Sequence, residues 1–377
     1  MVDMGDDAEV ADRLGGHRRV ALRAVGRQHA PCAPILPVIR GRSRGFSQEG
    51  PADGRRGGIA RSGLGADYRR RPPGRHRDAP GAEAGPVPEL PEVETVARQL
   101  APALTGRVLR EVRILDPRLR PFDSRGLCGR TIEAVRRVGK QVGLYLGPSA
   151  GRRPEILAVH LRMTGRLLFV PAGVRGPARH RRAVLRVDGG RVVFCDPRRF
   201  GTLRRAASER EILGPAVDPL DRALTSRRLA ALLAASHQQV KVWLLRQDRL
   251  VGLGNIYASE ILFEARISPF ARTDALDAAA VRRLHRALRA VLRRAIRCCG
   301  TTFSDFQDAH GMTGSYQALL RVYGREGEPC PRCGGAIARV VQQQRSTFYC
   351  PACTPDPGRH RHPDKRRAGG DPRLRKP

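Results

Sequence analysis

Lysine is almost absent from this 377-residue chain, although the chain is strongly basic. Lysine and arginine together number 70 against 36 acidic residues, yet only four are lysines, at positions 140, 241, 365 and 376. Arginine binds phosphate well, but only lysine readily acts as an amine or gives up its proton. Because Lys365 and Lys376 lie in a polar tail, Lys140 and Lys241 are the candidates for lysine-specific chemistry. The alternative is that these two lysines are ordinary surface residues, present through chance codon usage.

Acidic residues are few relative to the basic ones, and long apolar runs are also lacking. A net charge of +34 attracts polyanions, most simply nucleic acid, although a solvated basic surface is the other interpretation. No apolar run is long enough to span a membrane, and the N-terminus lacks the apolar core of a secretory signal. Five of the nine cysteines show no disulfide-framework spacing, so we expect a reducing cytoplasm.

Residues 1–87 contain no lysine and almost no periodicity, and stretches such as 69–75 cannot build a core. They are either a disordered basic extension or upstream DNA translated from a misplaced start. Val87 favours the second interpretation, because GTG encodes valine internally and methionine as an initiator. Removal of that methionine would leave Pro88 with a free secondary amine. A proline inside a chain has an amide nitrogen, which cannot act as a nucleophile.

The rest of the chain predicts an α+β multidomain protein. Residues 88–215 begin with a helix at 91–104 and continue as short strands, including 156–159, 166–170 and 191–194, typical of a β-sandwich or barrel. Residues 216–315 are predicted to be helical. Asp277 caps a helix whose apolar positions repeat until Gly300, and whose other face is arginine-rich. Residues 316–355 form a compact module, and 356–377 a basic disordered tail.

The compact module carries the strongest motif. Cys330 and Cys333 form one Cys-x-x-Cys pair and Cys350 and Cys353 another, sixteen residues apart. Four thiolates close a zinc tetrahedron without an open position for water, so we expect one structural Zn²⁺. The intervening residues predict a two-stranded hairpin that holds Arg345.

Several motifs occur in the order found in a known family. They are Pro88–Thr95, Val138–Lys140, His160–Gly165, Asp196–Gly201, Gly252–Glu260, Tyr323–Arg325 and the four cysteines. From Pro88 to about Cys353 the chain resembles bacterial formamidopyrimidine-DNA glycosylases. The resemblance implies an N-terminal β-sandwich, a helix–two-turn–helix domain and a C-terminal zinc-ribbon finger. It also implies a bifunctional repair enzyme that excises 8-oxoguanine and formamidopyrimidines from double-stranded DNA and cuts the strand by β,δ-elimination.

The resemblance assigns roles to four catalytic candidates. Pro88 would attack C1′ of the damaged nucleotide, and Glu89 would move a proton to the sugar during base loss. Lys140 would act near the 3′ phosphate in β-elimination, and Arg345 would hold phosphates and assist δ-elimination. An α-amine is roughly 10% free base at pH 7, against about 0.04% for an ordinary lysine, which favours proline as nucleophile. Glu92 and Glu94 are interpreted as helix-start acids.

Further residues would contact DNA. Met163, Arg198 and Phe200 match the residues that fill the void left by a flipped base. Asn255 would bind phosphate through its amide and nearby N–H groups. His180 matches a phosphate contact, and Lys241 a lysine near the lesion or its phosphate. The partner would be DNA containing oxidised purines, with no membrane, and the protein a monomer.

The chain departs from the family pattern at three places, and two alternative functions stay open. Arg246 replaces the usual aspartate before Gln247, Arg182 replaces a second histidine, and the loop around Met312 leaves lesion preference open. The chain is a catalytically silent DNA binder if residues 1–87 are retained. It is an endonuclease VIII-like enzyme for oxidised pyrimidines if the family branch differs, although Leu90–Thr95 favours the purine branch.

Overall fold

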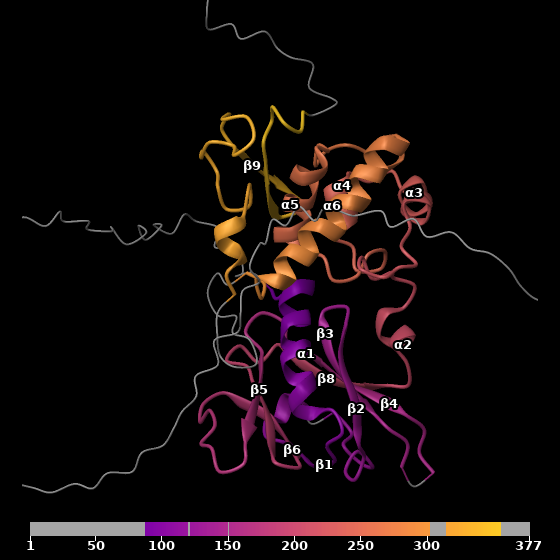
Figure 1. The fold of residues 1–377 in the computed structure, drawn as a ribbon, viewed down its shortest axis with the longest axis vertical. Helices are drawn as coiled ribbons and strands as arrows, with labels where there is room; N and C mark the ends of the chain where they lie inside the picture. Colours follow the sequence, from indigo (N-terminus) through magenta and orange to yellow (C-terminus); the bar gives the residue numbers. More distant parts are fainter. Residues whose placement is uncertain (1–86, 120, 150, 302–313, 356–377) are drawn as a thin grey trace, which may run out of the picture. The chain divides into compact units, whose positions relative to one another are not determined.

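The computed structural model describes residues 87–119, 121–149, 151–301 and 314–355 (Figure 1). The predictions for residues 1–86, for the tail 356–377 and for Met312 lie outside the described residues. The first part of the fold comprises α1 (Leu90–Leu104), β1 (Leu109–Ile114), η1 (Pro117–Leu119), β2 (Ile132–Val138), β3 (Gln141–Leu146), β4 (Glu155–His160), β5 (Arg166–Pro171), β6 (Arg181–Val187), β7 (Gly190–Cys195) and β8 (Thr202–Ala206). The second part comprises α2 (Glu209–Leu213), α3 (Ser226–Ala234), α4 (Val240–Leu244), α5 (Asn255–Ala265), η2 (Thr273–Ala275), α6 (Ala278–Arg297), η3 (Tyr316–Leu319), β9 (Ala338–Gln342) and β10 (Arg345–Tyr349).

Strands β1 to β8 form two four-stranded antiparallel sheets, in the orders β1-β6-β7-β5 and β2-β3-β4-β8. Apolar residues of both sheets, such as Phe194 and Leu157, belong to one buried core. The fold is therefore a sandwich, which settles the choice between sandwich and barrel. The predicted strands at 156–159, 166–170 and 191–194 are confirmed.

Helix α1 joins this core to a second one. Val93, Val96 and Leu100 pack into the sandwich, whereas Leu90 at the helix start belongs to the core of the helical part. Figure 1 shows α1 beginning beside α6 and continuing along the sheets. The residues just before α1, Pro88 and Glu89, therefore lie where the two cores meet.

The helical part follows the predicted pattern. The Asp277 side chain accepts the N–H of Ala280 at 2.6 Å and caps α6. The whole predicted apolar stripe of α6 is buried against α3 and α5. On the arginine-rich face, Arg283 and Arg289 donate to backbone carbonyls, so that face is partly structural. Within the described ranges, no helix combines the length and apolar character needed to cross a membrane.

Candidate functional site

The Glu89 carboxylate caps helix α5. It accepts backbone N–H groups from Gly254 at 2.7 Å, Ile256 at 2.9 Å and Tyr257 at 3.4 Å. The first N–H groups of a helix have no partner within the helix, and the helix dipole there favours negative charge. Glu89 is only 3% exposed, so its position is fixed by α5 rather than by solvent.

The turn before α5 is shaped to receive the start of α1. The N–H of Leu90 donates to the carbonyl of Gly252 at 2.9 Å, and Gly252 has a φ of +96°. A Cβ on Gly254 would lie 2.4 Å from the Glu89 Cδ atom, so any other residue there would displace the Glu89 carboxylate or α5. Gln247 holds the turn, because its Oε1 accepts the Gly252 N–H and its Nε2 donates to Leu253.

Burial raises the pKa of Glu89 to about 7. The charge of Lys140 and the N–H groups of α5 lower this pKa, and the nearby Glu92 raises it further, but desolvation is the largest effect. A carboxyl group that titrates near neutral pH can both donate and accept a proton. The local environment therefore suits Glu89 to proton transfer.

Glu92 is a helix-start acid in the first turn of α1, as the sequence interpretation held, and it also has tertiary contacts. It is buried and accepts hydrogen bonds from the Glu89 N–H at 2.9 Å, the Tyr257 hydroxyl at 2.6 Å and the Thr301 N–H at 2.7 Å. It thus ties α1 to α5 and to the segment that follows α6. The sequence signal for this role was the position of Glu92 three residues after Glu89, which is the N3 position of a capping box.

Glu94 instead carries ion pairs at the edge of this region. Its carboxylate pairs with Arg98 at 2.6 Å and with Arg137 at 2.9 Å, and Arg137 also pairs with Asp218 at 2.5 Å. These contacts join α1, β2 and the segment that leads into the helical part. Glu94 is therefore structural, as predicted.

Lys140 occupies the turn between β2 and β3. Val138 pairs with Gln141, so Gly139 and Lys140 form a two-residue hairpin turn in which only Gly139 has positive φ, +63°. Burial lowers the pKa of Lys140, the Glu89 carboxylate opposes the shift, and Arg345 adds to it. Glu89 and Arg345 thus each lie close enough to Lys140 to affect its pKa.

His160 was not singled out from the sequence, yet it belongs to the same group. It pairs with Gln141 across β4 and β3, and its Nδ1 accepts the Arg162 N–H at 3.1 Å. Burial, and then the charges of Arg162 and Lys140, lower its pKa to about 3. His160 is therefore a neutral imidazole at physiological pH. The available signal was its place in the His160–Gly165 motif.

Arg345 is the exposed first residue of β10, directly after the predicted hairpin turn. Gln343 and Gln344 have φ values of +44° and +60°, as a two-residue type I′ turn requires. Arg345 and Arg246 both line a cleft of about 180 Å³ between α4 and the hairpin. Arg246, one of the departures from the family pattern, also pairs with Asp248, Nε to Oδ1 at 2.9 Å.

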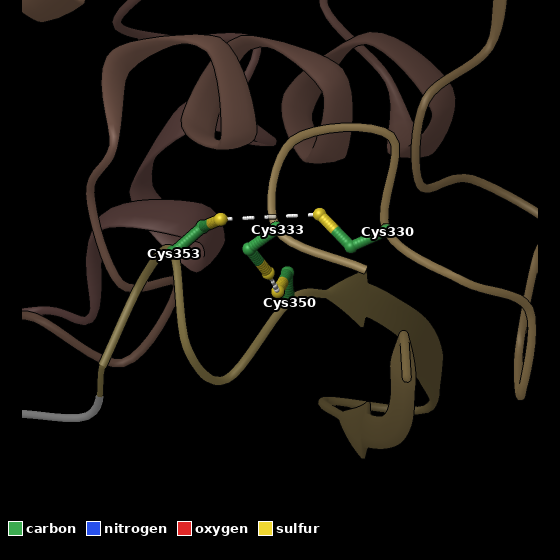
Figure 2. Close-up of side chains that lie close together, drawn as sticks. All are labelled: Cys330, Cys333, Cys350 and Cys353. Carbon is green, nitrogen blue, oxygen red and sulfur yellow. Dashed lines mark hydrogen bonds between the residues drawn. The ribbon is translucent and has the colours of Figure 1, made fainter. Parts of the chain in front are cut away.

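The four predicted cysteines converge (Figure 2). All four sulfur atoms lie within 4.8 Å of one another, and the Cys330–Cys353 and Cys333–Cys350 sulfur separations are 3.8 and 3.4 Å. Zinc with Zn–S bonds of about 2.3 Å requires tetrahedral edges of about 3.8 Å. The residues therefore fit one structural Zn²⁺, which when bound supplies a rigid base for β9 and β10.

Lys241 is fully buried, with 0% exposure. Its Nζ donates to Asn255 Oδ1 at 2.7 Å, to the Ser346 carbonyl at 2.8 Å and to Thr347 Oγ1 at 2.7 Å. We call these four residues the lysine clasp. It joins α4, the start of α5 and the zinc hairpin beside Arg345. That Lys241 lies near the lesion or its phosphate stays a prediction; the bonds observed here are all to protein groups.

Asn255 belongs to the same clasp. Its Nδ2 donates to the Ser346 carbonyl at 2.9 Å, and its Oδ1 accepts from Lys241. The neighbouring N–H groups of Gly254 and Ile256 are taken by Glu89. The predicted phosphate contact through these groups would therefore require them to exchange partners. A positioning role fits the observed bonds directly.

The three void-filling candidates lie on two loops that meet. Met163 is half-buried between β4 and β5, and Arg198 and Phe200 are exposed between β7 and β8. The Arg198 guanidinium lies 5.0 Å from the centroid of the Phe200 ring, which is 48% exposed. The Arg198 N–H donates to Thr164 Oγ1, next to Met163, at 3.3 Å. His180 is also exposed, just before β6.

Three family models match consecutive parts of the chain. The formamidopyrimidine-DNA glycosylase N-terminal domain matches residues 87–203, the H2TH domain of that enzyme residues 213–307, and the zinc finger found in FPG and IleRS residues 327–355. These spans agree with the sandwich, the helical part and the zinc module. The exact predicted boundaries at 215 and 315 stay a prediction.

Individual proteins give the same match. The formamidopyrimidine-DNA glycosylase of Symbiobacterium thermophilum is 41% identical over 282 residues, which cover 72% of this chain and 90% of that protein. The crystal structure of the Thermus thermophilus MutM (Fpg) protein aligns with a TM-score of 0.62 at 40% identity, over 71% of this chain and 98% of that one. The structure of a Lactococcus lactis Fpg mutant in complex with DNA containing Fapy-dG aligns with a TM-score of 0.62 at 30% identity. The alignment covers 71% of this chain and 100% of that one.

Proposed function

Because this chain belongs to the formamidopyrimidine-DNA glycosylase family, we propose that it is a bifunctional glycosylase and AP lyase of DNA repair. It excises oxidised purines, 8-oxoguanine and formamidopyrimidines, from double-stranded DNA and then cleaves the strand. The observation that carries this proposal is the Glu89 carboxyl group, held at the start of α5 with a pKa of about 7 and within electrostatic reach of Lys140.

Pro88 is the proposed nucleophile in a form of the protein whose chain starts at that residue. The free secondary amine attacks C1′ of the damaged nucleotide. The C1′–base bond breaks, its electron pair leaves with the base, and the base takes up the proton that the Pro88 nitrogen loses. Opening of the sugar ring, with a proton supplied to the ring oxygen by Glu89, gives an iminium cation between Pro88 and C1′. That cation withdraws electrons, which acidifies C2′ for the later eliminations.

Lys140 and Arg345 serve the strand-cleavage steps. Loss of a C2′ proton expels the 3′ phosphate, and a second elimination expels the 5′ phosphate. Lys140 is partly desolvated and close to Glu89, so its ammonium group can stabilise a leaving phosphate. Arg345 is exposed at the tip of the zinc hairpin, and a guanidinium binds phosphate through two parallel hydrogen bonds.

The damaged base must leave the stack before Pro88 can reach its sugar. Phe200 and Met163 are proposed to fill the resulting gap, and Arg198 to hydrogen-bond the orphaned cytosine. His180 is proposed to contact the backbone. Support comes from the exposed Phe200 ring with the Arg198 guanidinium stacked on it, since an exposed aromatic at a loop tip suits insertion between bases.

One observation favours a second candidate function for the chain as numbered. Val87 precedes Pro88, so in the 377-residue chain the Pro88 nitrogen is an amide and cannot attack C1′. That chain would bind lesion DNA without cleaving it. The zinc module and the helical part do not depend on the Pro88 amine, so binding would persist.

Excision assays on both forms distinguish these functions. Duplex DNA with a single 8-oxoguanine opposite cytosine is incubated with the 377-residue chain and with a form that starts at Pro88. We expect base release and strand scission only from the Pro88 form, with binding by both. No base release by either form from 8-oxoguanine or formamidopyrimidine duplexes would contradict the proposed activity.

A further inference from the structure

A buried network of charged residues underlies the two loops that carry Met163, Arg198 and Phe200. We call residues 161–165 and 196–201 the insertion loops. The Asp196 side chain is fully buried, and its carboxylate accepts the Thr164 hydroxyl, which belongs to the first loop. The same carboxylate accepts the N–H of Gly201 at 2.7 Å, at the end of the second loop. One carboxylate therefore holds both loops.

Arg182 provides the opposite charge. Its side chain is 2% exposed, and its Nη1 donates to the Gly201 carbonyl at 2.6 Å and lies 3.4 Å from Asp196 Oδ2. Its Nε donates to Asp116 at 2.6 Å. A buried charge is costly unless it is paired and hydrogen-bonded, and this guanidinium has both kinds of partner.

Asp116 extends the network to the surface. Arg199, in the second insertion loop, donates from Nε to Asp116 Oδ2 at 2.9 Å. That hydrogen bond, together with bonds from the Arg118 N–H and Arg182, holds the pKa of Asp116 well below its usual range. Asp116 is therefore ionised at neutral pH, and its carboxylate holds the Arg199 side chain in place.

Backbone strain gathers at the same place. Arg162, His180 and Arg199 have φ values of +55°, +58° and +61°, and they are three of the seven described non-glycine residues in the left-handed region. The His180 carbonyl accepts the Asp196 N–H at 2.9 Å, and the Arg199 N–H donates to the Asp196 carbonyl at 3.2 Å. Such strain persists only where the surrounding structure over-determines it, and it is typical of functional loops.

We propose that Asp196, Thr164 and Arg182 are positioning residues that hold the two insertion loops in one preformed arrangement, so that Met163 and Phe200 enter the DNA stack together. This inference rests on the proposed function, since it assumes insertion by these loops. None of the three side chains needs to touch DNA. Their role is to fix the relation of Met163 to Phe200 before binding, which lowers the conformational cost of insertion.

Thr164→Val tests this inference, because valine keeps the shape and removes only the hydroxyl that bridges Asp196 and the Arg198 N–H. Thr164→Ser restores the hydroxyl. Thr273→Val is the matched control, since Thr273 is also buried and its hydroxyl donates to the Ser236 carbonyl in the helical part. Melting temperatures of all variants verify that each protein is folded.

The readout is the fluorescence of 2-aminopurine opposite a tetrahydrofuran abasic analogue in duplex DNA, which rises when the base is unstacked. It needs no catalysis, so the full 377-residue chain is used. We expect Thr164→Val to slow the rise about tenfold, since small misplacements at such sites carry penalties of this order or larger. Thr164→Ser and Thr273→Val should match the wild type, and affinity for undamaged duplex should not change.

Two results would overturn the inference in distinguishable ways. An unchanged rise with Thr164→Val, while the wild type responds, would show that the insertion loops need no such bridge and would leave the proposed function intact. If the wild-type protein bound the abasic duplex without any rise in 2-aminopurine fluorescence, the loops would not insert into the stack. That result would overturn both the inference and the proposed roles of Met163 and Phe200.

Discussion

The Glu89 carboxylate accepts the Gly254 N–H at 2.7 Å, across 165 residues of chain. This bond, with that of Ile256, joins the first helix of the sandwich to the first turn of α5. Because Pro88 immediately precedes Glu89, the same contact fixes where the Pro88 nitrogen lies. The junction of the two cores and the candidate catalytic group are therefore one structural feature.

Gly254→Ala should damage this feature directly. The added Cβ would lie 2.4 Å from Glu89 Cδ, so the carboxylate or α5 must move. We expect a loss of about 1–3 kcal/mol in unfolding free energy, as for overpacking, and about a 100-fold fall in excision by the Pro88 form. Urea unfolding and single-turnover excision measure the two effects.

Gly106→Ala is the control for that change. Gly106 has a φ of +83° but no atom within 4 Å of an added Cβ, so alanine there adds only backbone strain. Its excision rate should stay within about twofold of the wild type, while stability falls by about 1 kcal/mol. Equal losses of activity in both variants would contradict a specific contact between Gly254 and Glu89.

The raised pKa of Glu89 predicts a pH dependence of stability. In the 377-residue chain the folded pKa is about 7 and the ordinary value is 4.5, so the folded state binds this proton more tightly. Stability from this group is then present at low pH and is lost as pH rises from about 4.5 to 7, by about 3 kcal/mol. Glu89→Gln should flatten that part of the profile, measured by urea unfolding at pH 5 and pH 8. A difference between wild type and variant that does not change with pH would contradict the raised pKa.

Much of the fold was predictable because it depends on local patterns. The α6 stripe from Val281 to Ile296, the Asp277 cap and the alternating strands are short-range signals, and the structure confirms them. The strand pattern by itself did not distinguish a sandwich from a barrel, because strand pairing such as β1 with β6 joins residues far apart in sequence. The sandwich implied by the family resemblance is confirmed. The zinc site was predictable because its ligands come as two closely spaced pairs.

Lys241→Met should weaken DNA binding without removing a DNA contact. The change leaves Asn255, Ser346 and Thr347 without their shared donor, at a cost of about 1–3 kcal/mol, and loosens the hairpin that carries Arg345. Because Lys241 is buried, the slope of log affinity against log salt should be unchanged. Fluorescence anisotropy between 50 and 200 mM salt provides the measurement.

Arg286→Met, on the exposed face of α6, is the control for a lost surface charge. The buried clasp would be contradicted if Lys241→Met reduced the salt slope by about one, the value for one lost phosphate contact. A variant that bound as tightly as the wild type would show that the clasp has no effect on the DNA-binding surface.

Removal of zinc should weaken DNA binding while the sandwich stays folded. Cys353→Ser removes one of four ligands, so we expect loss of bound metal and of most affinity for lesion DNA. The sandwich core contains no residue of the zinc module and should stay folded. Metal analysis and circular dichroism verify these points, with Cys128→Ser as the control because Cys128 is exposed and outside the cluster. Unchanged DNA affinity without metal would contradict the assigned role of the module.

The candidate site was less predictable than the fold. The sequence indicated Glu89, Lys140 and Arg345 separately, but the effect of Glu89 and Arg345 on the pKa of Lys140 depends on three segments that meet only in the folded protein. The burial of Lys241 and the hydrogen bonds of Glu92 to Tyr257 and Thr301 were missed for the same reason. The sequence does not distinguish a lysine or glutamate that is buried and hydrogen-bonded from one on the surface. The packing of α4, α5 and β10 buries Lys241, and the packing of α1 against α5 buries Glu92.

The central claim is that the free amine of Pro88 forms the covalent bond to damaged DNA. Borohydride reduces an iminium to a stable amine, so it traps the adduct, and mass spectrometry of the digested complex identifies the modified residue. With 8-oxoguanine duplex, we predict trapping by the form that starts at Pro88, with the sugar remnant on Pro88, and no trapping by the 377-residue chain. An adduct on Lys140 or any other side chain, or equal trapping by both forms, would contradict this mechanism.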